Sequence, residues 1–353
     1  MTATSRKKKL VVGSWPGREF ADNEFIRIFC SAIEGAGAEI VDVPDPALVA
    51  PKSLDILQIH WAEMVYWGKG SERAAEMRAL SVVRALWRLK RSGVKIIWMV
   101  HNLKPHNAGG LRRQLVWKLY GTTVAKLVDG VIALSPATLP LILQNLNFSK
   151  AVVSTSVRHP AYLVQINTGP DSRVEARSRF GVKRGSPVLS FVGHIRRYKG
   201  VERLIEAVKR TPEASLVAAG QCYEPFRSDI EQAAAGAENI DLRVGRLDDD
   251  AFEGLIAASD YVVLPFLDSL HSGSIVHALS LGRPVITPRS PFALDLQSIV
   301  GRDWLQLYDA PLSHKHIENL PPAPLGAPDL TKLSPALFGK EITEFYQSIV
   351  EKK

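Results

Sequence analysis

At 353 residues the chain is long enough for two domains of ordinary size, each with its own hydrophobic core. A net charge of +8 and a pI near 9.4 favour acidic partners such as nucleotides, nucleic acid or anionic lipid. Cys30 and Cys222 lie in different halves, which excludes a disulfide framework or a cysteine metal cluster and is typical of a reducing cytoplasm. No apolar run reaches the roughly eighteen residues of a membrane-spanning helix, and the basic start MTATSRKKKLVVG does not resemble a signal peptide.

In the first half, short apolar runs alternate with helical patterns, as they do in βαβ units. The expected strands are Leu10–Gly13, Glu39–Val43, Asp55–His60, Val94–His101, Gly130–Leu134 and Ala151–Ser154. A helix capped by Asp22 or Asn23 is expected to end at Gly35, and two helices rich in Arg and Lys are expected at Glu72–Arg91 and Leu111–Leu127. This pattern predicts a parallel, doubly wound, Rossmann-like domain.

The alternation lapses between Val164 and Ser186, in a polar and basic segment broken by Gly and Pro, which is typical of a domain boundary. A second alternating series follows. Its expected strands are Val188–Gly193, Ser215–Gly220, Ile240–Val244, Tyr261–Leu264, Pro284–Thr287 and Leu305–Leu307. Helices are expected at Val201–Val208, Phe226–Ala235, Asp249–Ala258 and Pro335–Lys352. Two Rossmann-like domains in tandem predict an α/β protein with a cleft facing the carboxyl ends of both sheets.

The stretch Tyr261–Pro288 contains the pattern of an anion site. A buried strand ends at Pro265, a loop of small residues follows, and apolar residues recur at helical spacing from Ile275 to Leu281. Free amides at a helix N-terminus and the helix dipole favour a phosphate there. An ordinary βαβ crossover with a polar turn produces the same pattern, so spacing alone leaves both interpretations open.

Three blocks in order resemble the C-terminal domain of GT-B glycosyltransferases of the GT4-like group. They are FVGHIRRYKGVERLIEAV (Phe191–Val208), NIDLRVGRLDDDAFEGLIAASDYVVLP (Asn239–Pro265) and SGSIVHALSLGRPVITP (Ser272–Pro288). In the first half, IHWAEMVYW (Ile59–Trp67) and VHNLKPHN (Val100–Asn107) look more loosely like loops of bacterial exopolysaccharide and mannosyl-type transferases.

The resemblance implies a GT-B fold, with an N-terminal acceptor domain over residues 1–165 and a donor domain over 166–330. A terminal helix over 331–353 would pack back on the N-terminal domain. It implies a glycosyltransferase that uses a nucleotide-sugar donor, with GDP-mannose favoured, a lipid-linked or polysaccharide acceptor, and neither a cofactor nor a metal. The residues implied to bind the donor are Gly193, His194, Arg196, Lys199, Arg246, Leu247, Ser272, Gly273, Ser274 and His277.

The chain departs from the family pattern at two places. Many GT4-like enzymes carry two glutamates eight residues apart around the phosphate helix, and here those positions hold Ser269 and His277. The usual arginine after the glycine of the first block is His194, so Arg196 is expected to take its place. These departures leave open the nucleotide base, the sugar, and whether the reaction retains or inverts its configuration.

Departure of a nucleoside diphosphate places negative charge on the leaving group, and without a metal this charge must meet cations and amides. Arg196 and Lys199, with the amides of Ser272–Ser274, are the expected clamp. The alternative is that both are solvated charges, although a cation at a helix N-terminus is unfavourable. His277 is expected either to contact the ribose or the sugar, or to be a core histidine.

An acceptor base is expected from the N-terminal domain, because an inverting enzyme must deprotonate the acceptor hydroxyl. The candidates are Glu63, His101, His106, Asp22 and Glu19. Glu63 and His101 follow predicted strands, where doubly wound folds place their chemistry. The alternatives are a salt-bridged loop carboxylate for Glu63 and a loop pinned by hydrogen bonds for His101. The run Asp248–Asp250 is interpreted as a helix N-terminus rather than a metal motif.

The two basic helices carry Trp and Leu beside their cations, which favours contact with an anionic membrane surface on the cytoplasmic side. The alternative is a pair of core-packed helices with arginine-rich outer faces. A catalytically silent nucleotide- or carbohydrate-binding protein is the alternative function, because the two glutamates are missing. Nucleic-acid binding is not expected, since no known nucleic-acid-binding pattern accompanies the high pI. The oligomeric state stays open.

Overall fold

A computed structural model describes residues 9–20, 23–66, 71–105, 110–164, 172–182, 186–309 and 311–351. The chain divides into two compact units. The first unit comprises Met1–Pro160 and Leu333–Lys353, and the second comprises Ala161–Lys332. The junctions of these units fall at 160/161 and 332/333, where the resemblance implies 165/166 and 330/331.

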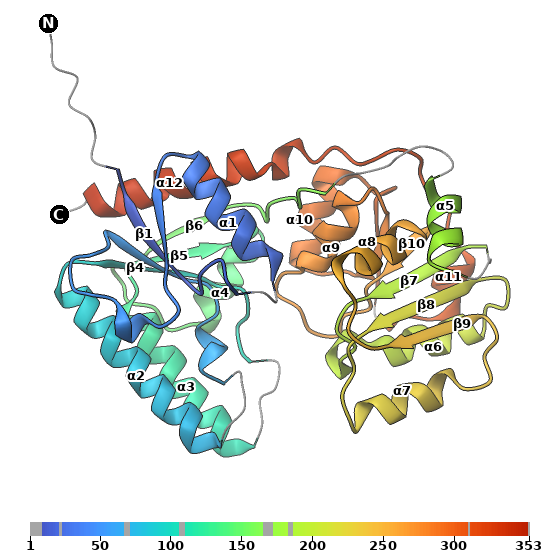
Figure 1. Cartoon of the computed structure of the whole chain (residues 1–353), viewed down its shortest axis with the longest axis horizontal. Helices are drawn as coiled ribbons and strands as arrows, with labels where there is room; N and C mark the ends of the chain where they lie inside the picture. The colour runs from blue at the N-terminus through green and yellow to red at the C-terminus, as the bar shows by residue number, and fades with distance from the viewer. Residues whose placement is uncertain are drawn as a thin grey trace, which may run out of the picture. The chain divides into compact units, whose positions relative to one another are not determined.

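In the first unit the described residues form one sheet of six parallel strands in the order β2-β1-β3-β4-β5-β6 (Figure 1). The strands are β1 (Val11–Trp15), β2 (Glu39–Asp42), β3 (Ile56–Ile59), β4 (Lys95–Met99), β5 (Gly130–Ala133) and β6 (Val153–Ser156). The α-helices are α1 (Glu24–Gly35), α2 (Glu72–Arg91), α3 (Leu111–Leu127), α4 (Leu139–Asn145) and α12 (Pro335–Glu351). Short 3₁₀ helices occur at η1 (Pro46–Leu48) and η2 (Ala62–Tyr66). The sequence predicts that this last strand begins at Ala151, but β6 begins two residues later, at Val153.

The last helix of the chain, α12, packs against α1 (Figure 1). Its apolar residues join the same core cluster as α1, and that cluster includes Phe29, Phe338 and Ile342. A side chain at Gly339 would collide with the backbone carbonyl of Ala32, so the two helices can approach this closely only at a glycine. The C-terminal segment is therefore part of the first unit's hydrophobic core.

In the second unit the described residues form another sheet of six parallel strands, in the order β12-β11-β10-β7-β8-β9. The strands are β7 (Val188–Val192), β8 (Ser215–Gly220), β9 (Ile240–Val244), β10 (Tyr261–Val263), β11 (Val285–Pro288) and β12 (Leu305–Tyr308). The helices are α5 (Ser172–Arg179), α6 (Val201–Lys209), α7 (Phe226–Ala234), α8 (Asp249–Ala257), α9 (Gly273–Ser280), α10 (Pro291–Val300) and α11 (His314–Glu318). Short 3₁₀ helices occur at η3 (Arg197–Lys199) and η4 (Thr331–Leu333).

The strand orders locate the functional edge of each sheet. The second unit has the Rossmann order, which reverses between β7 and β10, and the first unit reverses between β1 and β3. Ligands of doubly wound folds bind outside the carboxyl ends of the strands at such switch points. The relevant segments are therefore the loops after β7 and β10 in the second unit and those after β1 and β3 in the first.

Candidate functional site

The loop after β7 brings backbone close to backbone at the switch point of the second unit. Gly193 has a φ of +130°, and Gly220 at the end of β8 has a φ of +143°. A Cβ on Gly220 would overlap the carbonyl of Gly193, so this crossing requires glycine. The Gly193 amide donates to the Ala219 carbonyl over 2.9 Å. The resulting rigid turn fixes where the following cations lie.

Lys199 points back from the 3₁₀ turn into this loop. Its Nζ lies 3.7 Å from the position a Cβ on Gly193 would take, and 5.9 and 5.8 Å from the ring centroids of Phe191 and Phe266. Burial, together with the smaller effect of the Arg196 charge, lowers the pKa of Lys199 to about 8. The ammonium forms no hydrogen bond or ion pair with any residue that the structure describes. An enclosed cation with no counter-charge is suited to an anionic ligand.

Arg196 is half-buried beside Lys199 and also lacks a carboxylate partner among the described residues. Its guanidinium carbon lies 5.8 Å from the ring centroid of Tyr223. The next residue, Arg197, is exposed and pairs with Glu202 at 3.3 Å and Asp229 at 2.7 Å. The sequence places Arg196, Arg197 and Lys199 in one basic run. In the structure Arg196 and Lys199 have no described counter-charge, whereas Arg197 forms surface ion pairs.

The loop after β10 leads to the N-terminus of α9. The Leu267 amide donates to the Tyr198 carbonyl over 2.8 Å, which ties this loop to the basic turn. Ser272 caps α9 by accepting from the Ile275 amide at 3.3 Å, so the helix begins at Gly273, two residues before the predicted start. The amides of Gly273 and Ser274 donate to no other described residue. They are the free donors that an anion at a helix N-terminus requires.

His277 faces a small aromatic cluster from the first turns of α9. Its ring stacks on Tyr162 with centroids 4.3 Å apart and an angle of 4° between the planes. Its Nε2 lies 3.3 Å from Glu253 Oε1. Phe252 lies 5.3 Å from the His277 ring centroid and within 3.8 Å of the Cβ position of Gly193. His277 thus lies in a polar and aromatic environment, and Phe252 connects it to the Gly193 loop.

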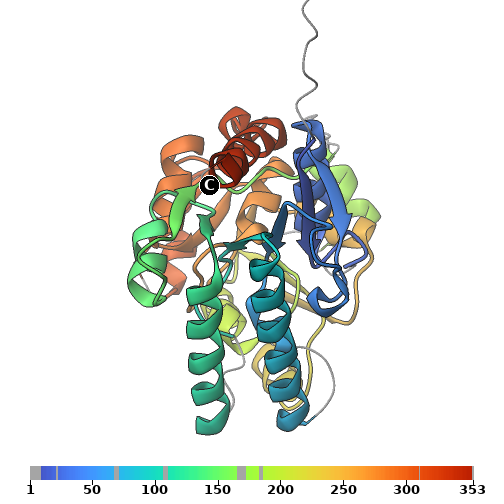
Figure 2. The same ribbon diagram turned by 90° about the vertical axis from the view of Figure 1, so that its left-hand side faces the viewer.

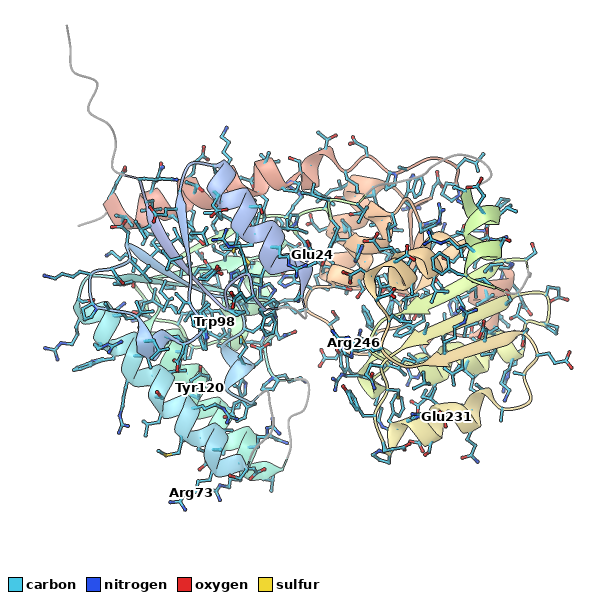
Figure 3. The ribbon with its side chains drawn as sticks, in the orientation of Figure 1. Glu24, Arg73, Trp98, Tyr120, Glu231 and Arg246 are labelled. Carbon is cyan, nitrogen blue, oxygen red and sulfur yellow. The ribbon has the colours of Figure 1, made fainter. Side chains whose placement is uncertain are left out.

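The remaining predicted donor residues also lie at the carboxyl edge of this sheet. His194 is exposed in the loop after β7, and Arg246 and Leu247 follow β9. The Gly245 amide donates to the Gly220 carbonyl over 3.1 Å, which holds that loop beside the glycine crossing. Arg246 is exposed and extends from the carboxyl-end side of the strands (Figure 3).

In the first unit, Glu63 lies in η2, directly after β3. It is only 2 % exposed, and Asn102 Nδ2 donates to its Oε1 over 2.6 Å. Burial raises the pKa of Glu63 to about 7, although the Asn102 hydrogen bond opposes the rise. No described Lys or Arg forms an ion pair with it, which contradicts the alternative of a salt-bridged loop carboxylate. A carboxyl that titrates near neutral pH is suited to acid–base chemistry.

Two histidines follow the same strands as Glu63 and Asn102: His60 comes directly after β3, and His101 precedes Asn102 after β4. His101 Nε2 is 3.4 Å from His60 Nδ1, and the His101 ring stacks on Trp61 with centroids 4.4 Å apart. Burial lowers the pKa of His60 to about 3, so this histidine is neutral at physiological pH. Its Nε2 has no hydrogen-bond partner in the described part of the chain. Tyr120, labelled in Figure 3, donates to the Ala62 carbonyl over 3.0 Å and fixes η2.

Of the other candidate bases, the structure describes Glu19 alone. Glu19 is exposed in the loop after β1. Asp22 and His106 lie outside the described residues. Sequence reasoning missed His159, which follows β6 and lies 5.1 Å from Phe25 between ring centroids. Its position just after the last strand of the sheet was the signal that could have identified it.

Comparisons with known proteins agree with the fold and with the donor-side motifs. Residues 186–303 match the family model described as glycosyl transferases group 1. A GDP-mannose:glycolipid 4-beta-D-mannosyltransferase of Xanthomonas campestris pv. campestris is 26 % identical over 286 residues, covering 79 % of this chain and 75 % of that protein.

Two solved structures share the whole fold at low sequence identity. Anabaena HepE in complex with UDP-glucose superposes with a TM-score of 0.63 and 15 % identity, covering 97 % of this chain and 98 % of that one. Sucrose-phosphate synthase from Thermosynechococcus elongatus gives a TM-score of 0.62 with 14 % identity, covering 98 % of this chain and 97 % of that one. At these identities the superpositions establish the architecture alone. Arguments about the substrates of this chain must come from its own residues.

Proposed function

For this chain, a GT-B glycosyltransferase of the GT4-like group, we propose that the donor is GDP-mannose and the acceptor a lipid-linked or polysaccharide glycan. The reaction would belong to exopolysaccharide biosynthesis. The observation that carries the proposal is the enclosed Lys199 ammonium, which has no counter-charge and lies beside the unpaired Arg196. Similarity to a relative named for GDP-mannose and a glycolipid supports the choice of donor and acceptor class.

The leaving diphosphate is held by Arg196, Lys199 and the free amides of Gly273 and Ser274. Negative charge grows on the leaving oxygen as the glycosidic bond to the nucleotide breaks, and pre-positioned cations and amides stabilise that charge. The two cations balance the diphosphate, so we propose that the enzyme needs no metal. His194, Arg246, Leu247 and His277 line the nucleotide and sugar ends of the donor.

On the acceptor side, Glu63 accepts the proton of the attacking hydroxyl if the reaction inverts the anomeric centre. Asn102 orients the carboxylate through its 2.6 Å hydrogen bond, and His101, the residue before Asn102, stacks on Trp61. Burial holds the pKa of Glu63 near 7, so a large fraction is ionised at neutral pH while its basicity stays high.

A ligand screen by thermal unfolding tests the choice of nucleotide. A ligand that binds only the folded protein raises its Tm, by an amount that follows its concentration relative to Kd. GDP and GDP-mannose are expected to raise the Tm more than UDP, ADP, TDP and their sugars at equal concentration. A larger rise in Tm with another nucleotide would contradict GDP-mannose as the donor and favour a donor that carries that nucleotide.

We also propose that the enzyme attaches to the inner face of the cell membrane through α2 and α3. Within the described residues no helix is both long and apolar enough to cross a bilayer. α2 and α3 run side by side (Figure 2). One exposed stripe on α2 combines cations with apolar side chains; its members are Arg73, Met77, Leu80, Arg84, Trp87 and Arg91. On α3 the exposed apolar residues are Leu111, Leu115 and Leu119.

The contacts of the basic residues separate membrane candidates from structural ones. Arg88 Nη2 donates to the carbonyls of Ala47 at 2.9 Å and Val49 at 2.8 Å, so its role is to hold the chain before β3. Arg84 has no hydrogen-bond or ion-pair partner among the described residues. A helix with a basic and Trp-bearing exposed face lies well in an anionic lipid interface.

Sedimentation with vesicles containing phosphatidylglycerol tests this attachment. Each cation near the surface contributes on the order of 1 kcal/mol, so the wild type is expected to co-sediment at low salt and to be released by several hundred millimolar salt. Arg84→Glu and Trp87→Ala are each expected to weaken binding several-fold. Arg302→Glu, an equal charge change in the other unit, serves as the control. If the wild type does not bind these vesicles at low salt, the lipid-linked acceptor is contradicted.

A further inference from the structure

A second pocket in the Ala161–Lys332 unit lies at the carboxyl ends of β10, β11 and β12. Its volume is about 510 Å³, within the range of small-molecule sites. The wall is formed by α6, the loop after β10, the start of α10 and the end of β12. The lining includes Arg203, Phe266, Asp268, Arg289, Ser290 and Tyr308.

The wall of this pocket contains a tyrosine hydroxyl that lacks a protein partner. Tyr308 is only 6 % exposed, and its hydroxyl forms no hydrogen bond with any described residue. Burial raises the pKa of Tyr308, and the nearby charge of Arg203 opposes that rise. The hydroxyl is therefore available to donate a hydrogen bond to a ligand that enters the pocket.

The charges around the pocket favour an anion. Arg203 lies on the wall and pairs with none of the described carboxylates, whereas Arg289 is held by Asp309 with an Nε to Oδ1 distance of 3.0 Å. Ser290 caps α10 by accepting from the Ala293 amide at 3.1 Å, so the positive end of this ten-residue helix faces the pocket. Asp268 is the acidic residue among the described lining residues.

We propose that this pocket binds a phosphate group, held by the Arg203 guanidinium, the Tyr308 hydroxyl and the N-terminus of α10. The pocket adjoins the diphosphate clamp, because Ser272 at the start of α9 lines both. Phe266 also lines the pocket, and its ring centroid is 5.8 Å from Lys199 Nζ. The phosphate comes either from a diphosphate-linked acceptor or from a soluble phosphorylated metabolite. The proposal does not depend on the identity of the donor.

Calorimetric titration with inorganic phosphate tests the pocket. The titration is made in the Arg196→Ala/Lys199→Ala double variant, in which the proposed donor clamp no longer competes for phosphate. In that background, Arg203→Gln and Tyr308→Phe are each expected to weaken phosphate binding about tenfold or more. Arg210→Gln, which removes an exposed charge near the end of α6 that does not line the pocket, is expected to leave it unchanged.

The two sources are distinguished by competition. A polyprenyl diphosphate in detergent micelles displaces phosphate if the ligand is a lipid-linked acceptor, and glucose 1-phosphate displaces it if the ligand is a soluble metabolite. The proposal is overturned if the double variant does not bind phosphate, if neither Arg203→Gln nor Tyr308→Phe weakens binding, or if neither competitor displaces it. Tyr308→Phe removes a single hydroxyl and is expected to fold normally. An unfolding transition equal to that of the parent protein is the control for this.

Discussion

Replacing Lys199 by alanine is expected to lower the rate of sugar transfer by about 10²- to 10³-fold while the protein stays folded. That range is the usual effect of removing one stabiliser of a developing anion, about 3–4 kcal/mol. The enclosed ammonium lies beside Gly193, between Phe191 and Phe266, and no described residue neutralises it. Its full charge is therefore available to the leaving diphosphate. Steady-state kinetics with a saturating acceptor measure the effect.

Arg196→Ala is expected to cause a loss of similar size, and the neighbouring arginine is the matched control. Arg197 is exposed and already paired with Glu202 and Asp229, so Arg197→Ala is expected to retain activity within a few-fold of the wild type. Equal losses in Arg196→Ala and Arg197→Ala, or wild-type turnover in Lys199→Ala, would contradict the clamp.

Stability measurements separate loss of function from loss of folding. The folded-state pKa of Lys199, about 8, lies below its ordinary value of 10.5, so the charged lysine destabilises the fold below pH 8. That penalty decreases as the pH rises from about 8 toward 10.5. Lys199→Met is therefore expected to unfold at a higher Tm than the wild type at pH 7, with a difference that shrinks at alkaline pH.

Glu63→Gln is expected to lower transfer by several orders of magnitude without weakening donor binding, provided that the enzyme inverts. Glutamine keeps the shape of the side chain and the contact with Asn102 but cannot accept the proton of the acceptor hydroxyl. Glu19→Gln, at an exposed carboxylate in the loop after β1, is the control and is expected to have little effect. Donor affinity is measured separately by calorimetry.

The pH dependence gives an independent check of both assignments. Glu63 must be ionised to act as a base, so kcat/KM is expected to rise with pH through about 7. Lys199 must be protonated to act as a cation, so kcat/KM is expected to fall above about 8. Substantial activity in Glu63→Gln with an unchanged acid limb would assign the proton transfer to His101 or to a retaining route.

Much of the fold follows from short apolar runs, because strands buried on both faces of a parallel sheet are continuously hydrophobic. The order of the strands and the glycine crossings do not follow from those runs. The start of α9 was predicted two residues late because Ser272, a polar residue, is the cap rather than part of the preceding loop. Asp248 was placed correctly, since its carboxylate accepts from the Ala251 amide at 2.7 Å.

The site was harder to predict than the fold because pairing and burial depend on distant residues. The sequence indicated Arg196 and Lys199 as cations, but only the structure shows that Arg197 is neutralised by Asp229 from another helix. In the same way, Arg88 belongs to a basic helix pattern, yet it binds two backbone carbonyls. Tyr308 and Arg203 line the same pocket although more than 100 residues separate them in the sequence, so no local pattern contains both.

The most direct measurement is release of GDP from GDP-mannose by the purified protein in the presence of EDTA and a glycolipid acceptor. Turnover that depends on the acceptor, persists without divalent metal and is lost in Lys199→Ala is the predicted result. GDP-mannose that binds but is never turned over would contradict transferase activity and favour a silent binding protein. Strict dependence on Mg²⁺ or Mn²⁺ would contradict the clamp of cations and amides.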